Sequence, residues 1–405
     1  MTETPTITTF GETVRIGASV VHISGHLELQ NVDGAIRPVR IPQRYWSHFP
    51  PHSAHVRATT TRPAGVRLTL TTASTVVNLR VKCTRLKVAD ILAEENSFVA
   101  RVDGREIAIV KSPTDAIEMT SLTGDDLGTE DIRESSLLEF SGLPAGEKTV
   151  EILLPQIMMV DLVDVYGNQP IEPGTPPARP VWIHHGSSIS HGSEPDKPTA
   201  PWPLVAADYA GLNVINLGFA GQCMLDPFVA DAIAATPADV ITLKIGINIV
   251  GARAMDQRTF VPGVHGFIDR IRVGHPTTPI VVASSLLWPG NEDRPGPTAR
   301  EDLPGGAYRF KALGTEADIA TGALSLAISR DHLRHVVEVR QSEGEAIHYL
   351  DGQLLYGEAD TATYSMPDGL HPDATLYREV GRRFAEYVFG EGGLIPITPR
   401  ETLDR

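Results

Sequence analysis

The chain has few cysteines, fewer basic than acidic residues, and no long apolar run. Of its 405 residues only two are cysteines, Cys83 and Cys223, which lie far apart in the sequence. Two such cysteines exclude a disulfide framework and any zinc module built on cysteines. No apolar run reaches the roughly 18 to 20 residues that a membrane-spanning helix needs. The N-terminal stretch lacks the basic and apolar regions of a secretory signal, so we expect a cytoplasmic protein.

Basic residues are outnumbered, with 35 lysines and arginines against 50 aspartates and glutamates and a formal net charge of −15. This excess of negative charge disfavours nucleic acids and anionic membranes as partners. The hydrophobic content of 41% is that of a soluble globular protein. A chain of this length exceeds what one hydrophobic core usually supports, so the sequence predicts two domains.

The first part of the chain, residues 1–166, has the pattern of β-structure. Residues 66–72, 76–83 and 105–112 alternate apolar and polar side chains, which is typical of half-buried strands. Between two such runs, Asp103-Gly104 indicates a hairpin turn. Many short strands separated by turn residues predict an all-β sandwich. Residues 167–179, rich in proline and glycine, then predict a stiff, extended linker.

After residue 180 short apolar strands alternate with longer helical patterns. This alternation predicts an α/β domain over residues 180–392, with a parallel sheet of about five strands covered by helices on both faces, and a tail over 393–405. In such sheets ligands bind at the carboxyl ends of the strands. We expect the strands at residues 181–186, 213–218, 239–246, 279–287 and 347–355.

Residues suited to acyl transfer follow these strands. Ser188 follows the first strand, Gly221 the second and Asn248 the third, while Asp368 and His371 precede the last predicted helix. A serine hydroxyl becomes nucleophilic when a base removes its proton, and histidine does this near neutral pH. A carboxylate on the other ring nitrogen fixes the histidine tautomer. A backbone N–H at Gly221 and the Asn248 amide are suited to an oxyanion hole.

These residues resemble the four sequence blocks of the SGNH, or GDSL-type, serine hydrolases. The first block usually reads GDS, and here Ser187 stands where the family has aspartate. The third block often continues with aspartate, and here Ile249 stands instead. The resemblance covers roughly residues 180–392 and implies a three-layer flavodoxin-like fold. It also implies Ser188 as nucleophile, His371 as base, Asp368 as its orienting acid, and Ser188, Gly221 and Asn248 as oxyanion donors.

The N-terminal part resembles, in its layout, the jelly-roll-like sandwich that precedes the catalytic domain in some carbohydrate acetyl esterases of this family. Together the resemblances imply a serine esterase that needs no cofactor. We expect it to hydrolyse short-chain esters, acetyl esters first, of a carbohydrate or small molecule through an acyl-enzyme. The natural substrate and a homo-oligomeric state stay open.

Three alternatives to this esterase remain. An acyltransferase of the same fold passes the acyl group to a hydroxyl instead of water. A non-catalytic carbohydrate-binding protein with a degenerate hydrolase domain is a second alternative. The third is a lipase of the α/β-hydrolase type, which needs a G-x-S-x-G motif. Here Ser190 occupies the last position of that motif, which argues against it.

Several neighbouring residues have weaker functional signals. His184 and His185 are adjacent and therefore point to opposite faces of a strand, and no H-E-x-x-H pattern accompanies them or His191. We therefore predict no metal site. His185, Trp288 and Met366 are candidates for lining the substrate pocket. His185 precedes Ser188, Trp288 follows the fourth predicted strand, and Met366 lies close to Asp368 and His371.

Two further features have mainly structural interpretations. Cys223 lies two residues past Gly221, where we expect a buried and inert thiol. Residues 288–308 are long, polar and rich in proline and glycine. They predict a surface loop, and a lid beside the site is a hypothesis.

Overall fold

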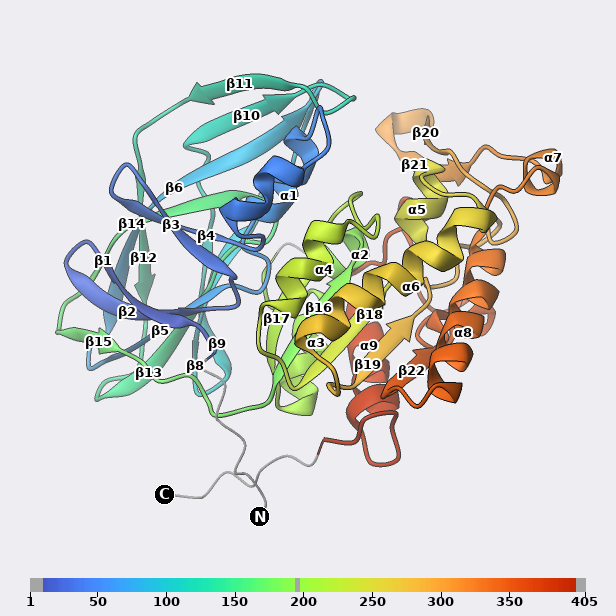
Figure 1. Cartoon of the computed structure of the whole chain (residues 1–405). Helices are drawn as coiled ribbons and strands as arrows, with labels where there is room; N and C mark the ends of the chain where they lie inside the picture. Colours follow the sequence, from blue (N-terminus) through green and yellow to red (C-terminus); the bar gives the residue numbers. More distant parts are fainter. Residues whose placement is uncertain (1–9, 194–196, 398–405) are drawn as a thin grey trace, which may run out of the picture. The chain divides into compact units, whose positions relative to one another are not determined.

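The computed structural model describes residues 10–193 and 197–397, which form two compact units (Figure 1). The first unit consists mainly of the chain up to Val181, and the second mainly of the chain from Trp182 onwards. Among the helices within the described ranges, none combines the length and the apolar character that crossing a bilayer requires.

The first unit is built from two β-sheets. One has the strand order β1-β2-β5-β13-β8-β9, with β15 also on β5, and the other has the order β11-β10-β6-β14-β4-β3, with β7 and β12 also on β6. Neighbouring strands pair antiparallel, apart from β10 and β6. The strands are β1 (Glu12–Ile16), β2 (Ser19–Ser24), β3 (Glu28–Val32), β4 (Ala35–Val39), β5 (Arg67–Thr72), β6 (Val76–Val88), β7 (Ile91–Leu92), β8 (Ser97–Val102), β9 (Arg105–Lys111), β10 (Ala116–Thr120), β11 (Asp126–Asp131), β12 (Ser136–Ser141), β13 (Lys148–Leu153), β14 (Met159–Gly167) and β15 (Ile171–Pro173), with the short helices η1 (Gln43–His48) and α1 (Ala54–Thr61) between β4 and β5.

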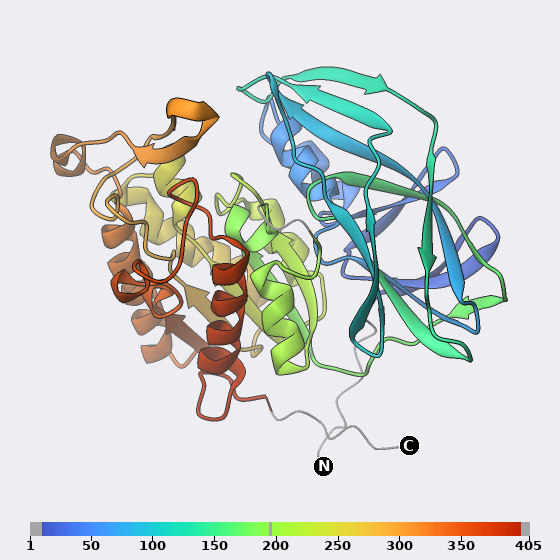
Figure 2. The same ribbon diagram turned by 180° about the vertical axis from the view of Figure 1, so that it is seen from behind.

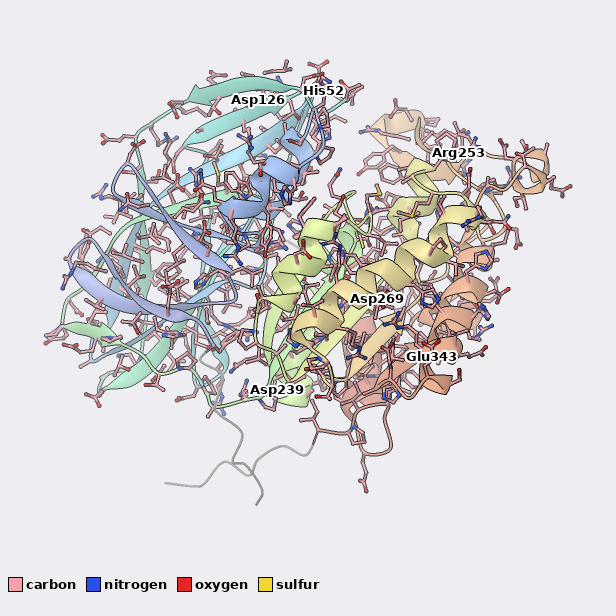
Figure 3. All side chains as sticks on the ribbon, in the orientation of Figure 1. His52, Asp126, Asp239, Arg253, Asp269 and Glu343 are labelled. Carbon is pink, nitrogen blue, oxygen red and sulfur yellow. The ribbon has the colours of Figure 1, made fainter. Side chains whose placement is uncertain are left out.

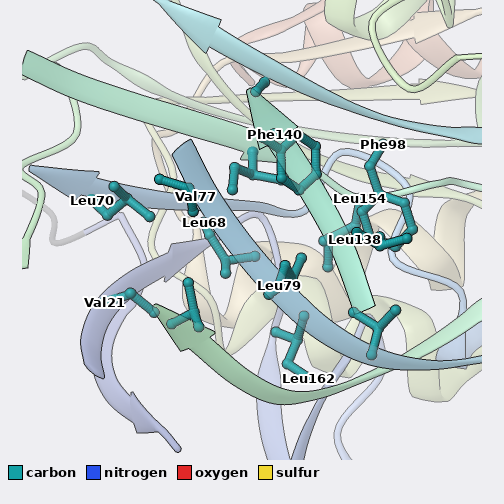
Figure 4. Close-up of a cluster of buried hydrophobic side chains, with 14 of the residues drawn as sticks. Val21, Leu68, Leu70, Val77, Leu79, Phe98, Leu138, Phe140, Leu154 and Leu162 are labelled. Atoms are coloured by element: carbon teal, nitrogen blue, oxygen red, sulfur yellow. The ribbon is translucent and has the colours of Figure 1, made fainter. Parts of the chain in front are cut away.

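Alternation along β6 decides which of its side chains enter the core between the two sheets. Val77 and Leu79 are fully buried, whereas Arg80 and Lys82 lie on the other face of the strand. The buried side chains join one hydrophobic cluster with residues of the other sheet, such as Leu68 (Figure 4). The predicted all-β domain is therefore confirmed, because the alternating runs bury one face each.

The predicted hairpin turn is also present. Asp103 and Gly104 connect β8 and β9, with φ angles of 50° and 73°. A two-residue turn of this kind needs positive φ at both positions, which aspartate and glycine tolerate better than other residues. The turn therefore fixes the register of the two strands locally.

Part of the predicted linker is a strand. β15 pairs with the end of β5, with Ile171 opposite Thr72. This edge is open because β2 pairs only with residues Arg67–Thr69 of β5. Three residues of the proline- and glycine-rich stretch thus complete the first sheet.

The second unit has a parallel sheet of five strands in the order β17-β16-β18-β19-β22. The strand order reverses direction after β17, so the crossover helices fall on both faces. Figures 1 and 2 show α4, α6 and α8 on one face and α3 and α9 on the other. The strands are β16 (Val181–Gly186), β17 (Asn213–Gly218), β18 (Val240–Lys244), β19 (Ile280–Ala283) and β22 (Ile347–Leu350), and the helices are α2 (Ser188–His191), α3 (Trp202–Ala210), α4 (Pro227–Ala234), α5 (Ile247–Ala252), α6 (Gln257–Gly274), α7 (Glu316–Ala320), α8 (Leu326–Ser342), α9 (Ala374–Phe384) and the short helices η3 (Gly352–Leu354), η4 (Glu358–Asp360) and η5 (Ala385–Phe389).

The predicted strands of this sheet are confirmed, and the last three are shorter than expected. β18, β19 and β22 end before residues 246, 287 and 355, because the chain leaves the sheet there to form the rim loops. The predicted surface loop 288–308 contains most of a hairpin, β20 (Thr298–Asp302) and β21 (Tyr308–Ala312), with η2 (Pro304–Gly306) at its tip.

Charged pairs across the hairpin explain how so polar a segment forms strands. Glu301 lies opposite Arg309 in the register, and its carboxylate accepts hydrogen bonds from Arg309 Nε and Lys311 Nζ, each at 2.6 Å. Opposite charges on facing strands stabilise a pair by a few tenths of a kcal/mol to about 1 kcal/mol. Because charged rather than alternating apolar side chains pair these strands, a search for apolar periodicity does not reveal the hairpin.

Truncation of a core side chain in the first unit should destabilise it measurably. We expect Leu79→Ala to lower the free energy of unfolding of that unit by about 2–5 kcal/mol, because the side chain is fully buried between the sheets. Urea unfolding monitored by circular dichroism tests this. Leu127→Ala is the matched control, since Leu127 is 57% exposed on β11 and its loss should change stability by less than about 0.5 kcal/mol. Equal effects of both substitutions would contradict the assignment of the core.

Candidate active site

Ser188 lies at the carboxyl end of β16, where the strand turns sharply into α2. Ser187 is extended, and its carbonyl accepts the N–H groups of Ser190 and His191 at 3.0 and 2.9 Å, so a single helical turn begins at Ser188. Gly186 is required before the turn, because a Cβ there would overlap the Ser190 hydroxyl. The Ser188 side chain is therefore presented at the rim of the sheet, partly exposed.

His371 and Asp368 come from the loop before α9 and meet Ser188. The Ser188 Oγ lies 2.8 Å from His371 Nε2, and His371 Nδ1 lies 2.6 Å from Asp368 Oδ2. A carboxylate only accepts, so Nδ1 carries the proton and Nε2 is left to accept the serine hydroxyl. The structure thus brings together the three residues predicted as nucleophile, base and orienting acid.

The Asp368 carboxylate is held in its charged form. Burial alone raises the pKa of Asp368, but the hydrogen bond and charge of His371 lower it more. The other oxygen, Oδ1, accepts the backbone N–H groups of Leu370 and His371 at 2.9 and 2.7 Å, which lowers the pKa further. An ionised Asp368 can stabilise an imidazolium on His371 as it forms.

Three hydrogen-bond donors at the rim have no acceptor within the described chain. They are the backbone N–H groups of Ser188 and Gly221 and the side-chain N–H₂ of Asn248. The oxygen of the Asn248 amide accepts the N–H of Cys223 at 3.2 Å, which fixes the orientation of the amide. The amide nitrogen is therefore left available to another acceptor. Gly221 has a φ of 71°, which glycine adopts without strain. These donors fit the predicted oxyanion hole, and that role stays a prediction.

The sequence did not reveal Asn216, which joins the first two rim loops. Its Nδ2 donates to the carbonyl of Ser190 at 2.8 Å, and its Oδ1 accepts the N–H of Gly218 at 2.9 Å. Gly218 must lack a side chain, because a Cβ would overlap the backbone of His191. The loop that carries Gly221 is therefore fastened to the turn that carries Ser188.

The two adjacent histidines of β16 point to opposite faces, as expected, and both are fully buried. His184 Nε2 lies 2.8 Å from Ser190 Oγ, and burial keeps the pKa of His184 well below its ordinary value, so the ring is neutral. His185 Nδ1 donates to the carbonyl of Leu217 at 2.8 Å, and its Nε2 faces the Cys223 sulfur at 3.4 Å. Both rings therefore contact residues of the loops that follow β16 and β17 and help to fix their positions.

This burial does not support His185 as a pocket residue, because the ring has no accessible surface. The same holds for Trp288, which is only 1% exposed, whereas Met366 is partly exposed and lies two residues before Asp368. Cys223 is buried, and burial raises the pKa of its thiol to about 12, which agrees with the expected inert thiol. Within residues 10–193 and 197–397, no three or more His, Cys, Asp or Glu side chains are grouped to hold a metal ion.

A second residue missed by the sequence analysis is Phe310, on β21. Its backbone N–H donates to the carbonyl of Asp368 at 2.7 Å. Its ring stands nearly perpendicular to that of His371, with 5.8 Å between the centroids and an angle of 81°. The hairpin therefore contacts the loop that carries both His371 and Asp368.

Two family models match parts of this chain. Residues 179–288 match the GDSL-like Lipase/Acylhydrolase family, and residues 21–162 match the N-terminal domain of SsfX3. A comparison with curated proteins found no match.

Solved structures share both domains with this chain. The salicylyl-acyltransferase SsfX3 from a tetracycline biosynthetic pathway has a TM-score of 0.72 and 28% identity, covering 89% of this chain and 92% of that one. A candidate GDSL-like lipase from Bacteroides ovatus has a TM-score of 0.63 and 16% identity, covering 90% and 93%. A family two carbohydrate esterase from Cellvibrio japonicus has a TM-score of 0.53 and 14% identity, covering 93% and 96%. The last two show a common fold.

The family match, the doubly wound sheet and the N-terminal all-β unit lead to one assignment. This chain carries a GDSL-like lipase/acylhydrolase domain preceded by an N-terminal domain of the SsfX3 kind.

Proposed function

We propose that the chain is a serine esterase that cleaves short-chain esters, acetyl esters first, of a carbohydrate or small molecule. One observation carries the proposal. The Ser188 hydroxyl, the His371 ring and the Asp368 carboxylate form a continuous hydrogen-bonded chain of 2.8 and 2.6 Å. This is the geometry that a nucleophile, a general base and an orienting acid need.

The first half of the reaction acylates Ser188. Its oxygen attacks the ester carbonyl while His371 Nε2 takes the hydroxyl proton, which gives a tetrahedral oxyanion and an imidazolium. The free N–H groups of Ser188, Gly221 and Asn248 stabilise the oxyanion. The carbon–oxygen bond to the alcohol then breaks, and the imidazolium gives its proton to the leaving alcohol. An acyl-enzyme on Ser188 remains.

The second half regenerates the enzyme by the same groups. His371 removes a proton from water, the hydroxide oxygen attacks the acyl carbon, and the same donors hold the new oxyanion. Collapse of this intermediate releases the carboxylic acid and returns the proton to the Ser188 oxygen. The preference for acetyl esters of carbohydrates is supported by the two-domain layout shared with family two carbohydrate esterases.

An acyltransferase is the second candidate, and one observation favours it. The chain is 28% identical to a salicylyl-acyltransferase over 89% of its length. In that reaction the acyl-enzyme forms in the same way, but an acceptor hydroxyl takes the place of water. The triad and the oxyanion donors serve both reactions equally.

Removal of the nucleophile tests the proposal directly. Ser188→Ala should lower the rate of 4-nitrophenyl acetate cleavage by at least about 10⁴-fold, because the remaining groups cannot form an acyl-enzyme. Release of 4-nitrophenolate measures the rate, and labelling by a fluorophosphonate measures formation of a covalent adduct.

Ser187→Ala provides the matched control for this test. Ser187 is the buried neighbour, and its hydroxyl has no hydrogen-bond partner among the described residues. Its removal should leave the rate nearly unchanged. Retained activity in Ser188→Ala, or equal loss in both variants, would overturn the assignment of the nucleophile.

The fate of the acyl group separates the two candidates. With 4-nitrophenyl acetate as donor and excess glucose as acceptor, we expect free acetate as the main product, because water reaches the acyl-enzyme. We also expect 4-nitrophenyl salicylate to react more slowly than the acetate. Mass spectrometry of the products gives the partition. A rate that rises with glucose, with acylated glucose as the main product, would favour the acyltransferase.

The β20–β21 hairpin links two of the loops on which this chemistry depends. At its base it packs closely on α5, the helix that carries Asn248, since Gly251 lies against Thr298 and Gly296 against the carbonyl of Val250. Through Phe310 it contacts Asp368 and His371. The Phe310 ring therefore helps to hold the imidazole in the orientation that reaches Ser188.

Loss of the Phe310 ring should weaken catalysis without removing it. An edge-to-face aromatic contact contributes about 0.5–1.5 kcal/mol, so Phe310→Ala should lower kcat by about two- to twelvefold with little change in KM. Phe310→Tyr should keep most of the activity, because the ring is retained. Leu313→Ala is the control, since Leu313 lies in the same segment and is 49% exposed. An unchanged kcat in Phe310→Ala would show that the ring does not position His371.

A further inference from the structure

The outer face of the eight-stranded sheet in the first unit is hollowed into a polar groove. It has a volume of about 700 Å³ and is lined by side chains from β4, β6, β10, β11 and β14 together with Trp46 of η1 and Arg57 of α1. The volume lies within the range of roughly 300–1,000 Å³ that small-molecule sites occupy. A second cavity of about 310 Å³ shares Arg57, Glu118 and Asp126 with it. Figure 3 shows Asp126 and His52, which line this second cavity, at the same end of the unit.

Some charged groups of the groove are paired with each other. The Arg37 guanidinium donates two hydrogen bonds to the carboxylate of Asp161, at 2.6 and 2.8 Å. Lys82 Nζ lies 2.7 Å from Asp131 Oδ1. These charges are paired within the protein, so a ligand would have to displace a partner to engage them.

Two other charged groups of the groove are not paired in this way. Neither the Glu118 carboxylate nor the Arg57 guanidinium makes a hydrogen bond or ion pair within the described residues, although both line the same cavities. Glu118 is partly buried, and burial raises its pKa more than the nearby arginines lower it. A partly buried carboxylate without a protein donor takes its hydrogen bonds from water or from a ligand. An acceptor and a donor thus line one cavity without a hydrogen bond between them.

An aromatic ring completes the groove. Trp46 is partly buried, and its Nε1–H donates to the carbonyl of Ile41 at 3.1 Å, which fixes the orientation of the indole. The Arg57 guanidinium lies over the ring, with its Cζ 5.6 Å from the centroid, and Phe49 stacks on the ring with 6.2 Å between the centroids. The part of the indole that stays exposed therefore offers an apolar surface beside the Glu118 carboxylate and the guanidinium N–H groups of Arg57, neither of which is hydrogen-bonded to a described residue.

The charges of the groove narrow the class of ligand. Three basic and six acidic side chains line the larger cavity, so phosphates and other anions are disfavoured. The described acidic residues do not include a group arranged to hold a metal ion. A neutral polyhydroxylated ligand fits best, because a hydroxyl both donates to a carboxylate and accepts from a guanidinium. The apolar C–H face of a sugar ring also packs on an indole.

We propose that this groove binds a neutral carbohydrate or glycosyl group, with Trp46 as the stacking surface, Glu118 as hydrogen-bond acceptor and Arg57 as donor. The inference is independent of the esterase proposal, because it concerns a site built entirely from the first unit. It gives that unit a binding role in addition to its connection to the hydrolase domain.

Calorimetric titration of the full chain tests the proposal. The probes are four neutral oligosaccharides, namely cellohexaose, xylohexaose, mannohexaose and maltohexaose, with spermidine and inositol hexaphosphate as cationic and anionic probes. At least one oligosaccharide should bind. Trp46→Ala and Glu118→Gln should each weaken that binding by at least about tenfold, because each removes an anchoring contact. Cleavage of 4-nitrophenyl acetate should stay unchanged in both variants.

Matched controls separate the groove from its surroundings. Tyr45→Ala removes the neighbouring ring of η1, which does not line the cavity, and Glu130→Gln removes an exposed carboxylate of β11 outside it. Both should bind as the unaltered chain does. Ser188→Ala should also bind normally, which distinguishes this groove from the catalytic site.

Four outcomes would overturn the proposal. These are failure of all four oligosaccharides to bind at millimolar concentration, binding of spermidine or inositol hexaphosphate alone, oligosaccharide binding that Ser188→Ala abolishes, and unaltered binding in both Trp46→Ala and Glu118→Gln. Glu118→Gln conserves shape, so it keeps the test valid should Trp46→Ala fail to fold.

Discussion

The hydrogen bond between Ser188 and His371 joins residues that lie 183 positions apart in the sequence. It therefore depends on the elements of the second unit that position each residue. Ser188 depends on β16 for its position, and His371 depends on the start of α9. An aromatic cluster holds these two elements together. Trp182 of β16 stacks on Phe384 of α9 with 5.5 Å between the ring centroids, and Trp202 of α3 lies 4.6 Å from Phe384. Burial of these rings therefore holds β16 and α9 against each other.

A chain of buried hydrogen bonds runs beneath the turn that carries Ser188, and it restricts how that turn can be arranged. Trp182 Nε1 and His184 Nδ1 both contact the Thr242 hydroxyl, at 2.8 and 2.7 Å, while His184 Nε2 contacts Ser190. A buried network of this kind has few alternative arrangements, because each broken bond leaves an unsatisfied group at a cost of about 1–3 kcal/mol. The neutral His184 can therefore hold the catalytic turn without adding charge beside it.

The sequence was sufficient to place Ser188, because it directly follows the first strand of a predicted parallel sheet, whose carboxyl ends share one edge. The Asp-x-x-His spacing placed Asp368 and His371 together before the last helix, and the structure brings both to Ser188. It was not sufficient to predict which way a rim side chain faces. His185 was expected in the pocket but stacks at 5.8 Å on Phe267, a contact that only the tertiary packing of α6 creates. Phe310 was missed because its hairpin is paired by charged residues, in a segment whose composition indicates a loop.

In the proposed mechanism the same groups serve hydrolysis and acyl transfer, so the difference between these reactions must come from what surrounds the acyl-enzyme. In that mechanism the group that attacks the acyl carbon gives its proton to His371 Nε2, and it therefore enters beside that ring. In this chain the hairpin β20–β21 contacts the His371 ring through Phe310, and Tyr308 lies 5.7 Å from Phe310 at an angle of 82°. An aromatic surface at this position favours a larger acceptor over water when it excludes solvent, and favours water when it leaves the imidazole open. The choice between esterase and acyltransferase is thus expected to depend on this hairpin rather than on the triad.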